Sequence, residues 1–173
     1  MTPGRLAGSS GSVRRTGYLG LGSNVGDRAG HLQAAIAMLG ATVEIEAVSE
    51  LYETEPVGEV TDQPDFLNAA ARIGTDLEPH ALLDLCKSIE AEHGRWLDAP
   101  RHSPRPIDID LLLLGDLELS DDRLTLPHPE VTSRRFVLVP LLELDPELAL
   151  SDGTRLSTAL AALGPGQRVT ALT

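Results

Sequence analysis

Asp108 and Asp110 alternate with isoleucines at the start of the apolar segment 107–114. This pattern, bounded by a proline and a glycine, predicts a buried β-strand. Successive strand side chains point to opposite faces, so both carboxylates lie on one face, with Cα atoms roughly 6.5–7 Å apart. Carboxylates this close repel unless a cation or a proton lies between them, and Mg²⁺ prefers carboxylate oxygen. Arg105 adds a guanidinium suited to phosphate. We therefore predict a metal–phosphate site; the alternative is two aspartates on the solvated face of an edge strand.

Six further segments accompany this one. They read YLGLGSNVGD at 18–27, YETEPVG at 52–58, QPDFLN at 63–68, IEAEHGR at 89–95, LPHP at 126–129 and RRFVLVPL at 134–141. With the stretch from Arg101 to Leu112, and in this order, they resemble the 6-hydroxymethyl-7,8-dihydropterin pyrophosphokinases over about residues 17–152. Several independent motifs in the right order are more specific than any one of them. Ser103 is a mild departure, since the family usually has Gly or Ala there.

The resemblance implies a diphosphate transfer in folate biosynthesis. The pterin 6-hydroxymethyl oxygen would attack the β-phosphorus of ATP, AMP would depart, and the diphosphate would move as a unit. Catalysis would consist of positioning and charge neutralisation, with no protein nucleophile. The resemblance further implies that Asp108 and Asp110 hold two Mg²⁺ ions and that ATP is the co-substrate.

Residue roles are carried over at positions that match the family motifs. The residues implied to bind the pterin are Thr54, Glu55, Pro56, Val57, Phe66, Asn68 and Phe136. Those implied to contact ATP are Glu90, Arg95, Arg101, Arg105, His128 and Arg134. Those implied to act in catalysis are Arg95, Arg105, Asp108 and Asp110, the two aspartates as metal ligands. Without the resemblance, the phenylalanines would read as core packing, Asn68 as a polar residue at a strand edge, and the charged residues as solvated surface.

The segment 96–106 departs from the family. Leu97 stands where relatives commonly have a second arginine, and Asp98 adds a negative charge to a loop that is usually basic. His102 stands where a tryptophan is frequent. Arg101 is then the nearest spare cation for the phosphates. Because the metal site is intact, we expect an active enzyme in which these changes affect the rate or the closure of the loop over ATP.

Hydrophobic periodicity predicts the elements that position these residues. Strands are predicted at 18–22, 43–52, 66–73 and 107–114, with a short one at 118–119, and helices at 28–39, from Pro79 to about Gly94, from near Ser133, and at 156–163. Irregular loops are predicted at 53–65 and 96–106. The order β-α-β-β-α-β is that of an α+β ferredoxin-like sandwich, an antiparallel sheet with helices on one face, here with additional C-terminal helices.

Composition narrows the class of protein. A chain of 173 residues is most simply one domain, expected at 17–173 after a flexible tail at 1–16. The net charge of −12 argues against nucleic acid as a partner, because a basic footprint is missing. An anionic substrate must then be held by a local cluster of cations and metal.

Other features indicate the compartment. Cys86 is the only cysteine, so an intrachain disulfide is excluded, and a structural reduced thiol is expected on the apolar side of its helix. No apolar run reaches the roughly 18 residues of a membrane span. The first 16 residues lack the apolar region of a secretory signal. We expect a cytoplasmic monomer whose partners are small molecules.

Two rival functions remain open from the sequence. A nucleotidyl- or glycosyltransferase that uses a metal-binding Asp-x-Asp would explain the carboxylates, but not Asn68 together with the segment 54–57. Product analysis separates the two, since AMP and a pterin diphosphate differ from pyrophosphate or a transferred sugar. A ligand-sensing module that has kept the pocket without turnover is the second rival, and Leu97 and Asp98 favour it.

Overall fold

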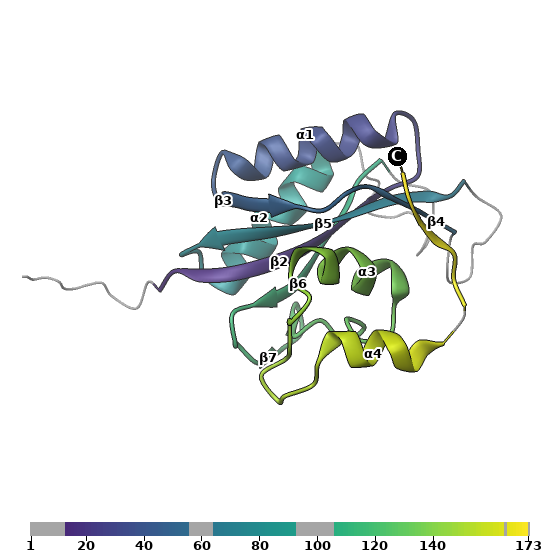
Figure 1. Cartoon of the computed structure of the whole chain (residues 1–173). Coiled ribbons are helices and arrows are strands. Elements are labelled where there is room, and N and C mark those ends of the chain that lie inside the picture. Colours follow the sequence, from purple (N-terminus) through teal and green to yellow (C-terminus); the bar gives the residue numbers. More distant parts are fainter. Residues whose placement is uncertain (1–12, 56–63, 93–105, 165, 173) are drawn as a thin grey trace, which may run out of the picture.

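The computed structural model describes residues 13–55, 64–92, 106–164 and 166–172 (Figure 1). In this part of the chain an antiparallel sheet has the strand order β6-β2-β5-β4-β9, and β3 pairs with β5 beside β4. The strands are β2 (Arg15–Ser23), β3 (Glu44–Val48), β4 (Tyr52–Thr54), β5 (Phe66–Thr75), β6 (Asp108–Leu114) and β9 (Val169–Ala171). Helix α1 (Arg28–Gly40) follows β2 and helix α2 (Pro79–Glu92) precedes β6, so the predicted βαββαβ order is confirmed.

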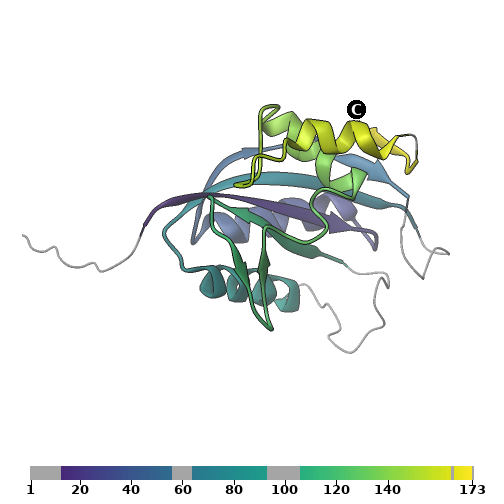
Figure 2. The ribbon, with the colours of Figure 1, turned by 90° about the horizontal axis from the view of Figure 1, so that it is seen from below.

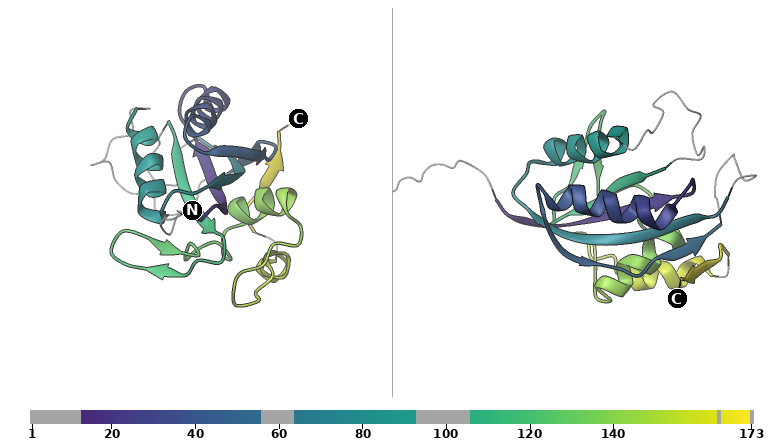
Figure 3. Two further views of the ribbon diagram at one scale, coloured as in Figure 1. Left: turned by 90° about the vertical axis from the view of Figure 1, so that its left-hand side faces the viewer. Right: turned by 90° about the horizontal axis from the view of Figure 1, so that it is seen from above.

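Helices α1 and α2 cover one face of the sheet (Figures 1 and 3). Their apolar side chains, Leu39 and Leu82 among them, pack with Leu19, Leu21 and Ile109 into the larger core. These strand residues occupy alternate positions, as the period of two requires. The residues between them point to the opposite face, which becomes the face of the candidate site.

Helices α3 (Arg135–Leu144) and α4 (Leu156–Leu163) cover the second face, where Tyr18, Leu112 and Leu138 belong to a separate core. Figure 2 shows the sheet between α2 on one side and the C-terminal helices on the other. The expectation of helices on one face is therefore incomplete, because the additional C-terminal helices close the other. A sheet buried on both faces explains why β2 and β5 contain long runs of buried residues.

The C-terminal end of α3 is hydrogen-bonded to the sheet through both tyrosines of the chain. The Tyr18 hydroxyl donates to Asp145 Oδ2 at 3.1 Å, and the Tyr52 hydroxyl donates to Glu143 Oε1 at 2.6 Å. These bonds fix the end of α3 that lies away from the site. The N-terminal end of the same helix is thereby held over the sheet.

The single strand predicted at 43–52 is broken into β3 and β4. At the break, the Ser49 hydroxyl accepts a hydrogen bond from the backbone N–H of Ala70 at 2.9 Å. The backbone N–H of Glu50 donates instead to the Glu143 carboxylate, at 3.1 Å to each oxygen. Side chains thus form hydrogen bonds with backbone groups that would otherwise continue the β-ladder. The apolar pattern of the sequence does not show this break.

Other boundaries differ by a few residues. β2 begins at Arg15 rather than at residue 18, and α3 begins at Arg135 rather than near Ser133. A two-stranded hairpin, β7 (Leu119–Ser120) with β8 (Thr125–Leu126), extends the predicted short strand. β9 was not predicted. Among the described residues, no helix is long and apolar enough to cross a membrane.

Candidate active site

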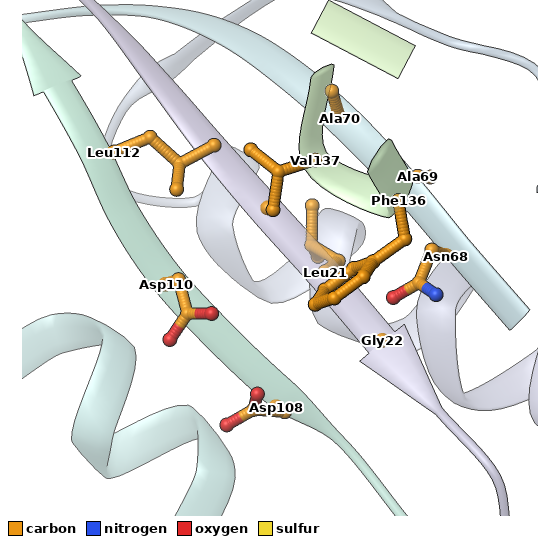
Figure 4. A pocket seen from close by; sticks show the side chains of 11 residues that line it. Leu21, Gly22, Asn68, Ala69, Ala70, Asp108, Asp110, Leu112, Phe136 and Val137 are labelled. Atoms are coloured by element: carbon orange, nitrogen blue, oxygen red, sulfur yellow. The ribbon is translucent and has the colours of Figure 1, made fainter. Parts of the chain in front are cut away.

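Two glycines of β2 form the floor of a small cavity on the α3 side of the sheet. Gly20 pairs with Asp110 of β6, and Gly22 pairs with both Asp108 of β6 and Asn68 of β5. Because glycine has no side chain, the backbone of β2 is uncovered between the two neighbouring strands. The cavity measures about 20 Å³, and the Phe136 ring lies over its floor (Figure 4).

Asp108 and Asp110 project from the same face of β6, as predicted (Figure 4). Burial, and then the Asp108 carboxylate, raises the pKa of Asp110 to about 7, while the Arg134 guanidinium lowers it. In the part of the chain that is described, no group of three or more His, Cys, Asp and Glu side chains converges as a complete metal site. Two mutually repelling carboxylates fit Mg²⁺ of the kind that keeps water and substrate phosphate as its other ligands.

Glu90 supports the aspartate strand from α2. Its side chain is 1% exposed, and its Oε2 accepts a hydrogen bond of 2.7 Å from the backbone N–H of Ile109, the residue between the two aspartates. Its Oε1 lies 3.6 Å from Nζ of Lys87. The carboxylate therefore holds β6 in place. Its predicted contact with ATP stays a prediction.

A second, larger cavity of about 260 Å³ lies along β6, between α2 and the β7–β8 hairpin. Apolar side chains line it at Leu83, Leu111 and Leu124, and cationic ones at Lys87 and Arg123. Asp110 lines this cavity as well as the first. The strand that carries the aspartates therefore separates the two spaces, and Asp110 faces both.

His128 also lines the second cavity. Its backbone N–H donates to the Leu112 carbonyl at 2.9 Å, and its Nδ1 accepts from the backbone N–H of Glu130 at 3.1 Å. Burial, and then the nearby Arg134 charge, lowers the pKa of His128. The ring is therefore neutral at pH 7. The hydrogen-bond pattern assigns its proton to Nε2, which leaves that nitrogen a donor.

Arg134 and Phe136 lie at the N-terminal end of α3. The Arg134 guanidinium carbon is 5.5 Å from the centroid of the Phe136 ring, within the range of a cation–π contact. Arg134 also forms an ion pair with Glu130. One arginine thus contacts the aromatic ring over the small cavity and acts electrostatically on Asp110.

Asn68 and Thr54 form a buried polar pair at the far side of the glycine floor. The Asn68 Nδ2 donates to Thr54 Oγ1 at 2.6 Å, and the two residues are 7% and 1% exposed. Phe66 lies beside them and pairs with Thr54 in the sheet. The structure therefore brings Thr54, Phe66, Asn68 and Phe136 together around Gly22, and Glu55 follows directly after Thr54.

Sequence reasoning missed part of this site. Gly20 and Gly22 were assigned to the predicted strand at 18–22, and the resemblance implied only that the turn beginning at Gly22 lies beneath the pterin pocket. Two glycines at alternate positions also indicate an uncovered strand face. Lys87, one helical turn before Glu90, shares its helix face and could have been found in that way. Arg123 lies at the second cavity because the β7–β8 hairpin places it there, and no residue spacing in the sequence predicts that hairpin.

Several predicted site residues fall outside the described residues, namely Pro56, Val57, Arg95, Arg101 and Arg105. The departures at Leu97, Asp98, His102 and Ser103 lie there too, as do the first twelve residues of the expected tail. Their predicted roles are neither supported nor opposed by the structure.

Comparison with known proteins identifies the family of the chain. The model of the family described as 7,8-dihydro-6-hydroxymethylpterin-pyrophosphokinase (HPPK) matches residues 18–146. A Methylorubrum extorquens protein named 2-amino-4-hydroxy-6-hydroxymethyldihydropteridine pyrophosphokinase is 50% identical over 150 residues, which are 86% of this chain and 93% of that protein. An Arabidopsis thaliana folate synthesis bifunctional protein is 46% identical over 127 residues, 73% of this chain but only 26% of that protein.

Solved structures show the same fold. The chain superposes on Plasmodium falciparum HPPK-DHPS wild type with a TM-score of 0.67 and 16% identity. The match covers 87% of this chain and 45% of the Plasmodium chain, so this chain spans less than half of that protein's length.

Proposed function

Since the chain belongs to the 7,8-dihydro-6-hydroxymethylpterin-pyrophosphokinase family, we propose that its two cavities hold the two substrates of one diphosphate transfer. The enzyme transfers diphosphate from ATP to the 6-hydroxymethyl group of 7,8-dihydropterin and releases AMP, a reaction of folate biosynthesis. The assignment of individual residues to this reaction is our proposal.

The pterin binds over the glycine floor of β2. Thr54 and Asn68 offer a buried hydroxyl and amide whose remaining donor and acceptor positions can read a heterocycle rich in polar edges. Phe66 and Phe136 offer aromatic faces for stacking. The cavity has room for about one water, so the pocket must widen when the pterin enters. Glu55, Pro56 and Val57 complete the proposed pocket from the sequence resemblance.

ATP binds along β6 in the larger cavity. Leu83 and Leu124 give the adenine an apolar surface, while Lys87, Arg123 and the neutral His128 supply donors. Glu90 holds β6 in place through the backbone of Ile109, and Arg134 acts electrostatically on Asp110, which lines both cavities. Arg95, Arg101 and Arg105 are proposed to complete the cationic surround.

Asp108 and Asp110 lie between the two substrates. When bound there, two Mg²⁺ ions would neutralise the phosphates and lower the pKa of the attacking hydroxyl. The aspartates would hold these ions, Arg134 balances charge on the phosphate chain, and Phe136 fixes the plane of the pterin so that its hydroxymethyl oxygen faces the β-phosphorus. The single observation that carries this arrangement is that Asp110 lines both cavities.

We further propose a cytoplasmic monomer made of a single domain, predicted at 17–173 and beginning in the structure with β2 at Arg15. In the described segments, the exposed large apolar side chains are scattered at Val13, Val25, Val48 and Leu172, which supports the absence of a large apolar interface.

The test is a turnover assay with ATP, Mg²⁺ and 6-hydroxymethyl-7,8-dihydropterin in which nucleotide products are quantified. We expect AMP and a pterin diphosphate. ADP would indicate transfer of a single phosphoryl group, and release of pyrophosphate would indicate nucleotidyl transfer. Asp108→Asn and Asp110→Asn should each lower the rate by at least about 10²-fold, as expected for a dominant electrostatic contribution. Asp116→Asn, just beyond the same strand and exposed, is the matched control and should keep the wild-type rate.

A further inference from the structure

The C-terminal strand contacts the pterin side of the proposed site, although it lies beyond the residues that match the family model, 18–146. β9 pairs with β4 along its whole length, with Thr54 opposite Val169 and Tyr52 opposite Ala171. The backbone N–H of Leu172 also donates to the Leu51 carbonyl at 2.8 Å. The chain thus returns from α4 to form the outer neighbour of the strand that ends at Thr54 (Figure 1).

Two residues just before β9 continue this contact beyond the ladder. Gln167 Nε2 donates to the Glu55 carbonyl at 2.6 Å, and the backbone N–H of Arg168 donates to Glu55 Oε1 at 3.0 Å. Glu55 is therefore held by both its backbone and its side chain. It is the residue directly after Thr54, whose hydroxyl accepts the hydrogen bond of Asn68.

The Arg168 side chain reaches a second anchor. Its Nη2 lies 2.5 Å from Oδ2 of Asp65, the residue directly before Phe66. The Asp65 carbonyl accepts from Arg28 at 3.0 Å, so Asp65 is also tied to α1. Arg168 consequently links Glu55, which follows β4, to Asp65, which precedes β5. Its backbone N–H binds Glu55, and its guanidinium binds Asp65.

We propose that Gln167 and Arg168, together with β9, position the pterin subsite, and that Arg168 is a positioning residue for pterin recognition. This inference rests on the proposed function, since it concerns the same pocket. The anchor Glu55 is itself a proposed pterin contact next to Thr54, and the anchor Asp65 is one residue from Phe66. Fixing both anchors lowers the conformational freedom that the pocket would lose on binding, and so favours pterin affinity.

The expected effect is modest and specific. Arg168 and Asp65 have side chains that are 58% and 32% exposed, and exposed ion pairs contribute little to overall stability. Their removal should therefore leave folding nearly unchanged while the geometry of the pocket is loosened. The backbone bond of Arg168 to Glu55 survives any side-chain substitution, so the guanidinium can be tested alone.

The experiment measures kcat and the KM for each substrate in Arg168→Ala. We expect the KM for the pterin to rise about two- to fivefold, the range of one exposed ion pair, with kcat and the KM for ATP unchanged. Gln167→Ala combined with Arg168→Ala should raise it further. Arg168→Lys should recover part of the pterin affinity that Arg168→Ala loses. Asp65→Asn should raise the KM for the pterin as much as Arg168→Ala does, and the double variant should show no further rise.

Arg155→Ala is the matched control. Arg155 pairs with Glu147 at 2.6 Å through side chains that are 50% and 80% exposed, and neither residue lines either cavity. Arg155→Ala should leave kcat and the KM for each substrate unchanged. The proposal is overturned if Arg168→Ala leaves the KM for the pterin unchanged, or if it raises the KM for ATP equally. Failure of the wild-type enzyme to form AMP would instead reject the proposed function, so the two failures are distinguishable.

Discussion

A Cβ atom added at Gly22 would lie 2.6 Å from Oδ1 of Asn68, closer than real Cβ atoms approach. The two residues are register partners on neighbouring strands, and Asn68 is 93% buried, with its amide hydrogen-bonded to Thr54. The amide therefore occupies the space that any other residue at position 22 would fill. The bare backbone of β2 thus sets the position of the Asn68 amide, the polar group proposed to face the pterin.

The first prediction follows from this contact. Gly22→Ala should displace the Asn68 amide and raise the KM for the pterin by at least about tenfold, since a buried hydrogen-bonding pair is disturbed. Steady-state kinetics with each substrate varied in turn would measure it. Gly40→Ala is a suitable control, because a Cβ there lies 3.5 Å from Ile45, an ordinary contact. A normal KM for the pterin in Gly22→Ala would show that the amide does not read the substrate.

The second prediction concerns Asn68 itself. Asn68→Ala should weaken pterin binding by about 1–3 kcal/mol, because partners that the amide satisfied are left unpaired in a buried site. ATP binding should change much less. Isothermal titration with each ligand separates the two effects, and Thr54→Val removes the other partner of the same pair. Equal losses for both ligands, or none, would place Asn68 outside the pocket.

The third prediction uses the titration of Asp110 in metal-free protein. Its pKa of about 7 in the fold lies above the ordinary value of 3.8, so between these pH values the folded state holds more protons than the unfolded state. Stability therefore falls as the pH rises from about 4 to about 7, and stays lowered above that range. Asp110→Asn removes this loss. The free energy of unfolding of Asp110→Asn at pH 8 should exceed that of the wild type by about 1–2 kcal/mol. This is less than the pKa shift would give for a fully buried group, because the carboxylate is partly exposed and solvent screens its charge.

Urea unfolding in EDTA at several pH values tests this stability difference. The advantage of Asp110→Asn should be full at pH 8 and should shrink steadily as the pH is lowered through 7 towards 4. Mg²⁺ with an ATP analogue should then stabilise the wild type more than the variant. A variant that is less stable than the wild type at pH 8 would show that the carboxylate pair is already neutralised within the fold.

The fourth prediction concerns the thiol of Cys86, which the sequence assigned to a structural role. The residue is fully buried, and burial, followed by the nearby Glu90 carboxylate, raises its pKa to about 12. The thiolate is then scarce at pH 8, and the sulfur is inaccessible. Native protein should resist iodoacetamide for hours, whereas protein in urea should be modified completely, as mass spectrometry would reveal. Rapid modification of the native protein would contradict the packing of α2 against the sheet.

The parts of the fold that could be predicted from sequence are those with local periodicity. The alternation at 107–114 was enough to place Asp108 and Asp110 on one face, because the side-chain period of a strand is geometric. The boundaries of α4 were predicted correctly from its apolar spacing, and those of α1 to within one residue. Asn68 and Phe136, by contrast, were assigned through the family resemblance. The hydrophobic periodicity of their segments does not predict that Asn68 and Phe136 meet over Gly22.

The remainder depends on tertiary contacts. β9 has only three residues, mostly exposed, which is too short a stretch for its own pattern to predict a strand. It forms where β4 offers it a partner. The break at Ser49 depends on a hydroxyl and on Glu143, which lies almost a hundred residues later. The larger cavity is lined from α2, β6 and the β7–β8 hairpin together. No single stretch of sequence contains that arrangement.

The chain has two tyrosines, and each donates its hydroxyl to a carboxylate at the C-terminal end of α3. Burial and the adjacent carboxylates raise both pKa values, that of Tyr52 to about 12. In the ultraviolet spectrum at alkaline pH, phenolate absorbance should therefore be lower while α3 is seated on the sheet than after the helix detaches, with Tyr52 contributing most clearly to the difference. An alkaline jump followed by phenolate absorbance would thus report, without any label, when the helix carrying Phe136 leaves its place.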